Sequence, residues 1–191
     1  MTALTTVPLP VSRARDPEEE GGLPSLPGFY AWWAATLALP DVPLSPHPQV
    51  GELGLLYVGI APGNASSSQT VRSRVIKNHL SGNLGSSTFR FTLAALLRET
   101  LQLHPEKRTT KLVLPSTENK QLSKWQEEHL QLTWCAYDTP WLIEHEVIEE
   151  MEPPLNLAAN SQHLFHARLS EARRALRVAA ATSPSDSEGS G

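Results

Sequence analysis

The chain has 191 residues, of which 40% are hydrophobic and 19% charged, so it is about the size of one globular domain with flanking segments. Its single cysteine excludes an internal disulfide framework and indicates a reducing compartment. No run approaches the roughly 20 apolar residues of a membrane helix, and no basic region precedes an apolar stretch near the N-terminus. We therefore expect a cytoplasmic protein that does not associate with a membrane.

The composition predicts one domain between two tails. Residues 1–22 contain three prolines and a run of three glutamates, and residues 179–191 are rich in Ser, Asp, Glu and Gly towards their end. Such segments bury little apolar surface. We therefore expect flexible tails over residues 1–22 and 179–191, with a folded domain over residues 23–178.

The first half of this domain is predicted to contain a hairpin followed by a helix. Residues 28–34 and 53–60 are apolar runs with aromatic residues, which is typical of strands. Four prolines within residues 39–51 predict a long loop between these strands. Three consecutive serines at residues 66–68 offer N-caps for a helix over residues 69–80.

The second half is predicted to alternate helices with short strands. The expected elements are a helix over 89–103, a short strand over 112–114, a helix from Ser116 or Thr117 to His129, a strand over 130–137 and helices over 141–151 and 162–177. Together with the hairpin, they predict an α/β fold in which a small, mostly antiparallel central sheet is flanked by helices.

Positive charge is concentrated in one segment although the net charge is −4. Residues 71–112 carry eight Lys or Arg against two Glu, a local net charge of +6. Phosphate backbones respond to local positive patches. Lys77 and Arg90 are therefore candidates for phosphate binding, and Arg90 also lies at a predicted helix start, where backbone amides favour anions. The alternatives are a solvated helix face for the charged segment and simple capping at the helix start.

Two short motifs near the first strands suggest a specific chemistry. They are Gly28-Phe29-Tyr30 and Tyr57-Val58-Gly59, and Glu144 and Asn156 follow much later. Two tyrosine hydroxyls on adjoining strands and one carboxylate on a helix can form a one-metal site that cleaves phosphodiesters. This arrangement resembles the GIY-YIG nuclease superfamily. The resemblance implies a GIY-YIG fold and a metal-dependent endonuclease that hydrolyses phosphodiester bonds in DNA with Mg²⁺ or Mn²⁺.

The resemblance assigns the metal to Glu144. In the family the metal-binding glutamate precedes a hydrophobic-isoleucine pair by three and four positions, and here Val147 and Ile148 stand at those positions. The same helical spacing turns Glu144 towards the sheet. Glu146 is the alternative ligand, and a solvated acidic face is the structural alternative for this segment.

The resemblance also assigns roles around the scissile phosphate. Tyr57 corresponds to the general base, and Tyr30 to a group that positions phosphate or water. The family carries an arginine early in the following helix, which is Arg74 here, with Arg72 as the alternative. It also carries an aromatic residue or histidine four positions later, whereas His79 stands five after Arg74, so the role of His79 as acid, base or phosphate ligand is left open.

The remaining expectations concern how substrate is held. Gly59 permits close approach of backbone or substrate, and Asn156 matches an asparagine of the repair nucleases in the superfamily. The family often has a lysine directly after the second tripeptide, where this chain has Ile60. The alternative function is therefore a nucleic-acid-binding module with the nuclease fold and little or no turnover. The residues do not distinguish DNA from RNA, and they do not indicate an oligomeric state.

Overall fold

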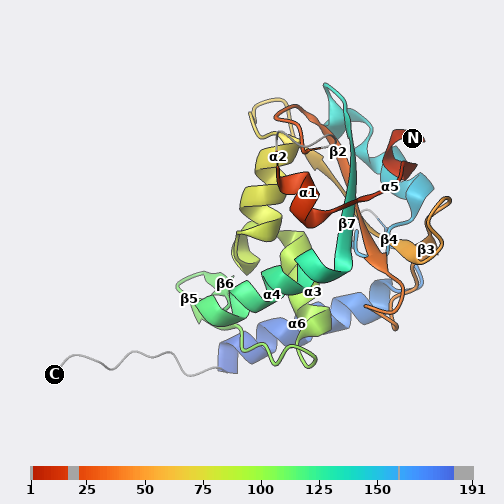
Figure 1. Cartoon of the computed structure of the whole chain (residues 1–191). Coiled ribbons are helices and arrows are strands. Elements are labelled where there is room, and N and C mark those ends of the chain that lie inside the picture. Colours follow the sequence, from red (N-terminus) through yellow and green to blue (C-terminus); the bar gives the residue numbers. More distant parts are fainter. Residues whose placement is uncertain (1, 17–21, 159, 183–191) are drawn as a thin grey trace.

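The protein is described by a computed structural model over residues 2–16, 22–158 and 160–182. Its centre is an antiparallel sheet in the order β1-β7-β2-β4-β3 (Figure 1). The strands are β1 (Leu9–Pro10), β2 (Gly28–Ala35), β3 (Ser45–Pro46), β4 (Leu53–Ala61) and β7 (Leu130–Ala136), while β5 (Glu106–Arg108) and β6 (Lys111–Val113) form a separate hairpin. The predicted α/β fold with a small antiparallel sheet is confirmed.

Helices cover both faces of the sheet. They are α1 (Val11–Arg15), α2 (Val71–Ser73), the π-helix η2 (Arg74–Leu80), α3 (Thr88–Leu97), α4 (Ser116–His129), α5 (Glu144–Met151) and α6 (His166–Thr182), with short 3-10 turns η1 (Thr2–Thr5), η3 (Leu84–Ser86) and η4 (Pro140–Leu142). In Figure 1, α2 and α3 lie to one side of the sheet and α5 to the other, while α6 crosses below. No helix in these described ranges is both long enough and apolar enough to cross a membrane.

The alternation of side chains along β2 produces two hydrophobic clusters. Trp32 belongs to a large cluster that also contains residues of α3, α4 and α6, whereas Trp33 belongs to a smaller cluster with Val147 and Ile148 of α5. Successive residues of a strand point to opposite faces, so Trp32 packs against the helices on one face of the sheet and Trp33 packs against α5 on the other. Burial of a large apolar side chain stabilises the fold by about 1.5–3 kcal/mol.

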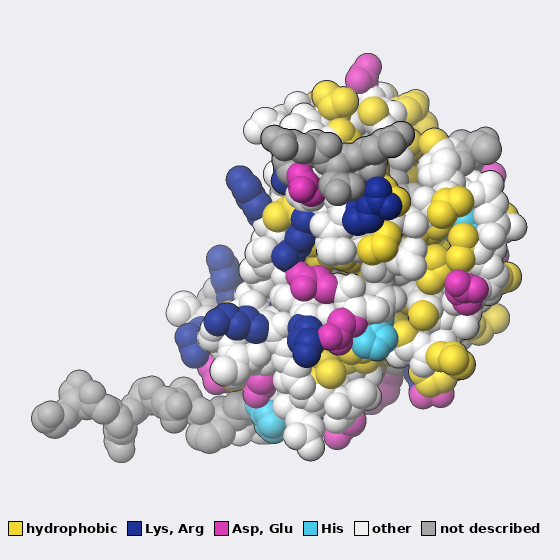
Figure 2. Space-filling view, viewed as in Figure 1, with side chains coloured by type: hydrophobic (Ala, Val, Ile, Leu, Met, Phe, Trp, Pro, Cys, Tyr) yellow, Lys and Arg dark blue, Asp and Glu magenta, His cyan; other side chains and the backbone are white. Residues whose placement is uncertain are grey.

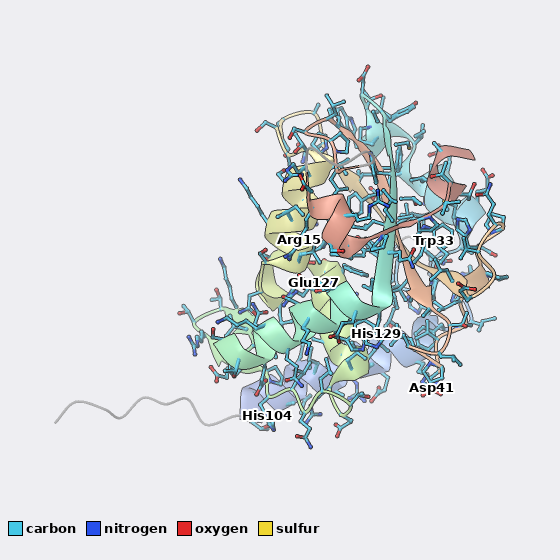
Figure 3. The ribbon with its side chains drawn as sticks, viewed as in Figure 1. Arg15, Trp33, Asp41, His104, Glu127 and His129 are labelled. Carbon is cyan, nitrogen blue, oxygen red and sulfur yellow. The ribbon has the colours of Figure 1, made fainter. Side chains whose placement is uncertain are left out.

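The N-terminal segment is packed rather than a flexible tail over residues 2–16. β1 pairs with β7, and Val11 and Ala14 of α1 are fully buried. Arg15 forms an ion pair with Glu127 of α4, with 2.8 Å between the nitrogen and oxygen atoms (Figure 3). The prolines of this segment end its short elements but do not prevent packing, because apolar residues between them reach the core. The run of three glutamates falls outside the described residues.

Several helix boundaries differ from those predicted. The helix expected over 89–103 ends at Leu97, and the chain then turns through Gln102, whose backbone is left-handed with φ of 49°. The helix expected over 69–80 is capped by Thr70 rather than by the serines before it. The helix expected over 141–151 begins at Glu144 after η4, and the last helix begins at His166 instead of 162.

The expected strand 112–114 is displaced by one residue and belongs to the β5–β6 hairpin rather than to the central sheet. At the other end of the domain, α6 continues to Thr182, beyond the expected boundary at 178. The rest of the expected C-terminal tail, residues 183–191, lies outside the described residues.

Candidate active site

Strands β2 and β4 place the Tyr30 ring directly across the backbone of Gly59. The two residues are register partners, and a Cβ atom on Gly59 would lie 2.3 Å from the Tyr30 hydroxyl oxygen and 2.4 Å from its Cζ. Any other side chain at position 59 would therefore occupy the space of the phenol. The glycine predicted to allow close approach does so, but the group that approaches it is Tyr30 of the protein itself.

Strand alternation places Tyr57 on the same face as Tyr30, because Tyr57 stands two residues before Gly59, the register partner of Tyr30. Trp32 pairs with Tyr57 and Trp33 with Leu55, so Leu56 is the additional residue. A bulge changes which side chains alternate to each face. Leu55 accordingly packs in the α5-side cluster, whereas Tyr57 contacts the large cluster that contains Tyr30. Both phenols thus lie on one side of the sheet, and the bulge changes the face only of the residues of β4 before Tyr57.

The π-helix η2 brings Arg74 and His79 to this side of the sheet as well. Its amides bond to carbonyls five residues earlier, as shown at its end, where the Ser81 N–H donates to the Ile76 carbonyl at 3.0 Å. In this geometry residues five apart lie on nearly the same helix face, as residues four apart do in an α-helix. The spacing of five between Arg74 and His79 is therefore accommodated by the form of the helix.

His79 is fully buried and hydrogen-bonded through both ring nitrogens. Its Nε2 lies 2.6 Å from the Tyr30 hydroxyl, and its Nδ1 lies 2.6 Å from Ser87 Oγ. Burial lowers the pKa of His79 well below its usual value, and the charges of Arg74 and Arg90 lower it further. The ring is therefore neutral at pH 7, and it can accept the Tyr30 proton at Nε2 while Nδ1–H donates to Ser87.

Of the two candidate arginines, Arg74 faces the tyrosines. It hydrogen-bonds to the side chain of Tyr30, and its charge lowers the pKa values of both Tyr30 and Tyr57. Arg72 instead donates a hydrogen bond of 2.7 Å to the backbone carbonyl of Arg15 in α1. Of the two candidates, Arg74 is thus the one that lies near the tyrosines, and its catalytic role stays a prediction.

Tyr57 and Glu144 line one cleft of about 730 Å³ at the edge of β4. Residues of α5, of the segment after it and of α6 form the other walls, including His145, Asn156 and Arg173. Burial raises the pKa of the Glu144 carboxyl, and Arg74 partly opposes this shift. Within the described chain the Glu144 carboxylate has no hydrogen bond or ion pair, so its oxygens are available to a ligand.

The pKa values of Tyr57 and Tyr30 are both raised. Burial raises the pKa of Tyr57 to about 12, with a further increase from Glu144 that Arg74 and Arg173 oppose. The pKa of Tyr30 is raised well above its usual value, first by burial and then by Tyr57. Both phenols are therefore protonated at neutral pH in the free protein, and added positive charge near them would favour the phenolate.

The side-chain amide of Asn156 is hydrogen-bonded to the edge strand β4 and is not free to bind a ligand in the cleft. Its Oδ1 accepts from the Val58 N–H at 2.9 Å, and its Nδ2 donates to the Val58 carbonyl at 2.7 Å. The neighbouring Leu155 N–H donates to the carbonyl of the bulge residue Leu56 at 3.1 Å. This segment thus holds the edge of β4 on either side of Tyr57, through Leu56 and Val58.

Arg90 and Lys77 do not reach the cleft. The Arg90 guanidinium is buried and donates to the carbonyls of His79 and Leu80 and to side chains of α4, and burial lowers its pKa to about 10. It therefore joins the end of η2 to α3 and α4. Lys77 is exposed and does not line this cleft, and Glu146 is also exposed. On the face shown in Figure 2, Lys and Arg side chains are interspersed with Asp and Glu, so that face carries no continuous basic band.

The family of the chain follows from a match over most of its length. A family model described as the GIY-YIG catalytic domain matches residues 28–175. The chain belongs to the GIY-YIG family. No curated protein and no solved structure matches the chain. The matched range starts at the first tripeptide and includes the part of α6 that lines the cleft, so the resemblance in the two tripeptides is confirmed.

GIY-YIG nucleases generally use divalent metals, and the donor set of this cleft is compatible with one. No group of three or more His, Cys, Asp or Glu side chains that could hold a metal occurs within residues 2–16, 22–158 and 160–182. Mg²⁺, however, retains several waters and is commonly bound through one or two carboxylates together with substrate phosphates. The unpaired carboxylate of Glu144 beside an open cleft fits such a site.

The sequence analysis did not identify Arg173, a charged residue of the cleft. Arg173 of α6 lines the cleft, and its charge acts on Tyr57. It lies outside the positively charged segment 71–112, and only the packing of α6 on α3 brings it to Tyr57. Nothing in the local sequence of α6 distinguishes Arg173 from Arg174, which points to a different cavity.

Proposed function

We propose that the protein is an endonuclease that hydrolyses phosphodiester bonds in DNA, with Mg²⁺ or Mn²⁺ held at Glu144. The observation that carries this proposal is that Tyr57 and Glu144 line one cleft at the edge of β4 and that the charge of Arg74 acts on both, although the three residues come from segments far apart in the sequence. Hydrolysis of a phosphodiester requires a group that accepts the proton of water and positive charge beside the phosphate. Tyr57 in the cleft offers the first, and Arg173 in the cleft and Arg74 in the adjoining cavity offer the second.

The residues in and beside the cleft have distinct tasks in this proposal. Arg74 neutralises charge on the scissile phosphate and orients it. Tyr57, as phenolate, accepts a proton from the attacking water, which then forms the new bond to phosphorus while the bond to the leaving oxygen breaks. Tyr30 holds Arg74 by its hydrogen bond and is itself held by His79. A divalent ion at Glu144 would supply additional charge neutralisation and stabilise the leaving alkoxide.

The test is a cleavage assay with matched carboxylate variants. Full-length protein is incubated with plasmid, branched DNA, single-stranded DNA and single-stranded RNA, in Mg²⁺, in Mn²⁺ and in EDTA. We expect metal-dependent DNA cleavage, lost by about 10³-fold or more in Glu144→Gln because the metal and the charge that it supplies are lost. Glu146→Gln is the control, because Glu146 is an exposed carboxylate on the same helix turn.

The free energy of unfolding of both variants should lie within about 0.5 kcal/mol of the wild-type value, because neither carboxylate is fully buried. A Glu144→Gln protein that cleaves at the wild-type rate would assign the metal elsewhere, with Glu146 as the first candidate. Cleavage of RNA but not DNA would overturn the substrate assignment.

The second candidate is a nucleic-acid-binding module without turnover. The observation in its favour is Ile60, which stands where the family often has a lysine and is packed in the α5-side cluster. Binding of DNA in EDTA with no cleavage under any metal condition would support this candidate over the nuclease.

A further inference from the structure

A second cavity continues the cleft and has a markedly different lining. It measures about 360 Å³ and shares Thr88 and Arg173 with the cleft that contains Tyr57 and Glu144. Four cationic side chains line it, and Asp and Glu are absent from its lining: Arg74, Lys111, Arg173 and Arg177. Three hydroxyl side chains of residues 86–88 form another part of its wall. Such a lining is suited to an anion.

Two of these cations are held together on one aromatic ring. Arg173 and Arg177 are one turn apart on α6, and their Cζ atoms lie 5.1 and 4.8 Å from the centroid of the Phe91 ring. Cation–π contact favours each position, but two like charges so close repel each other. Burial lowers the pKa of Arg173, and the charge of Arg177 lowers it further, which shows the cost of the second cation there.

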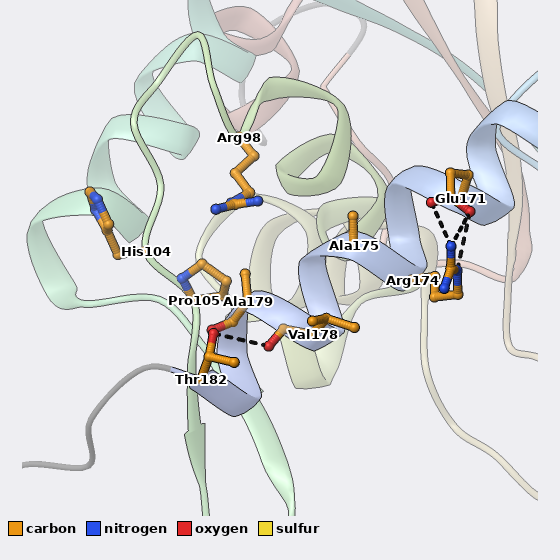
Figure 4. Close-up of a pocket in the computed structure, with 9 residues that line it drawn as sticks. All are labelled: Arg98, His104, Pro105, Glu171, Arg174, Ala175, Val178, Ala179 and Thr182. Carbon is orange, nitrogen blue, oxygen red and sulfur yellow. Dashed lines mark hydrogen bonds and ion pairs between the residues drawn. The ribbon is translucent and has the colours of Figure 1, made fainter.

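This cost has no compensation from acidic groups in the described part of the chain. Neither Arg173 nor Arg177 forms an ion pair there, and the Nε of Arg173 is buried without a hydrogen-bond partner. By contrast, the intervening Arg174 forms three hydrogen bonds of 2.7 to 3.1 Å with the Glu171 carboxylate on another side of α6 (Figure 4). Arg174 on the outer side of α6 therefore has a carboxylate partner, whereas Arg173 and Arg177 at the cavity have none in the described residues.

The N-terminus of α3 adds to the positive potential. Ser87 caps this ten-residue helix by accepting from the Arg90 N–H at 3.0 Å, and no acidic residue occupies the first turn. The positive end of the helix dipole favours an anion at this position. Ser87 and Thr88 line the cavity at this helix start.

We propose that this cavity binds the phosphate of the nucleotide next to the scissile phosphodiester, so that Arg173 and Arg177 of α6 grip the substrate strand. This proposal rests on the proposed nuclease function for the identity of the strand, while the ligand chemistry itself is a phosphate group. The strand would run from Glu144 past Thr88 and Arg173 to Arg177. Arg173 would then supply the positive charge that Ile60 does not provide.

The experiment measures binding in EDTA, where cleavage does not take place. Fluorescence anisotropy of a labelled single-stranded oligonucleotide is recorded with full-length protein from 25 to 200 mM salt. Wild type is compared with the double variant Arg173→Gln/Arg177→Gln and with Arg174→Gln, which removes a charge from the same helix. Because each phosphate contact contributes about 0.7 to the salt slope for a single strand, and the cavity binds one phosphate, we expect the double variant to reduce the slope by about 0.7.

A competition experiment with inorganic phosphate distinguishes two possible ligands of the cavity, a nucleic-acid strand and a free phosphate ion. We expect inorganic phosphate to displace the oligonucleotide only at concentrations far above that of the oligonucleotide, because it occupies one subsite of a longer groove. Inorganic phosphate is compared with an unlabelled oligonucleotide at the same total concentration of phosphate groups. If the two displace the labelled oligonucleotide equally well, the cavity is a free-phosphate site and the strand proposal is overturned.

The outcomes separate this proposal from the nuclease proposal. If the double variant keeps the slope of Arg174→Gln, α6 does not grip the strand, whether or not the wild type cleaves DNA. If the slope falls as expected while the wild type cleaves nothing in Mg²⁺ or Mn²⁺, the phosphate site stands and the nuclease function fails. Circular dichroism of each variant checks that the fold is retained.

Discussion

On the sheet side of the cleft, Tyr30 and His79 are buried and hydrogen-bonded to each other, whereas on the α6 side Arg173 and Arg177 have no acidic partner in the described chain. The first side is complete before any ligand arrives, because each group already has its partner. The second side lacks a counter-charge. The difference indicates that the sheet side fixes the geometry of the reacting groups, while the α6 side gains its stabilisation when substrate binds.

This division has a physical basis in the cost of reorganisation. Groups that stabilise developing charge are most effective when they are already oriented, and burial of Tyr30 and His79 beside Arg74 provides this on the sheet side. Accessible arginines lose side-chain entropy on binding, but they can adapt to a strand. Variants on the sheet side should therefore change catalysis or stability, and variants on the α6 side should change binding and its salt dependence.

The largest expected effect is on catalysis by Tyr57. In Tyr57→Phe we expect cleavage to fall by about 10²–10⁴-fold, the usual contribution of a general base, with little change in oligonucleotide affinity. Because the pKa of Tyr57 is raised to about 12, its phenolate fraction is small at pH 7 and increases about tenfold for each pH unit below 12. Single-turnover rates of the wild type should therefore rise between pH 7 and 9, and those of the variant should rise less. Equal pH slopes would assign the base elsewhere.

A stability effect on the sheet side should come next. In Gly59→Ala, the new Cβ would lie 2.3 Å from the Tyr30 hydroxyl oxygen, so the ring must move and its bond to His79 is strained or lost. Overpacking of this kind costs about 1–3 kcal/mol, measurable by urea denaturation. Gly63→Ala is the control, since a Cβ there would meet nothing within 4 Å. Equal stability of both variants would show that Tyr30 is not held tightly.

The buried histidine should produce a smaller, pH-dependent effect. The pKa of His79 in the folded protein is lowered well below its usual value, so the unfolded chain binds one more proton once the pH falls below about 6.5. Stability should therefore decrease as the pH falls through this range, by up to about 1.4 kcal/mol per pH unit from His79. His79→Gln should remove this contribution, seen as a flatter dependence of the unfolding free energy on pH from 7 to 5. An unchanged dependence would contradict a buried neutral ring.

The smallest effect is expected at Arg72. Its side chain donates to the Arg15 carbonyl, away from the tyrosines, so Arg72→Gln should cost about 1 kcal/mol or less and leave the cleavage rate within about twofold. Arg74→Gln, which removes the cation beside Tyr30 and Tyr57, should lower the rate by at least about tenfold in the same assay. If the two variants ranked in the opposite order, the structural choice between these arginines would be wrong.

Much of the fold followed from local patterns in the sequence. The strands expected over 28–34, 53–60 and 130–137 are all present, because apolar, aromatic runs between turn residues favour extended structure wherever they pack. The N-terminal segment was missed, since its prolines and polar residues obscure Val11 and Ala14, whose burial depends on α4 and β7.

The candidate site was only partly predictable for the same reason. The tripeptides and Glu144 are visible as residue types at a given spacing. The placement of Arg74 and His79 on one face depends on η2 being a π-helix, and the edge of β4 around Tyr57 is held by the distant segment at Leu155 and Asn156. Neither feature has a local sequence signal that we could identify.

The sequence by itself determined the chemical groups available to this protein and the local elements that carry them, because strand and helix periodicities depend on neighbours in the chain. The tertiary structure decided which groups meet. Arg173 and Tyr57 are separated by more than half of the chain, and they approach only because α6 packs on α3 beside the edge of β4. Such a contact is set by the shape and burial of whole elements, which no short sequence pattern encodes.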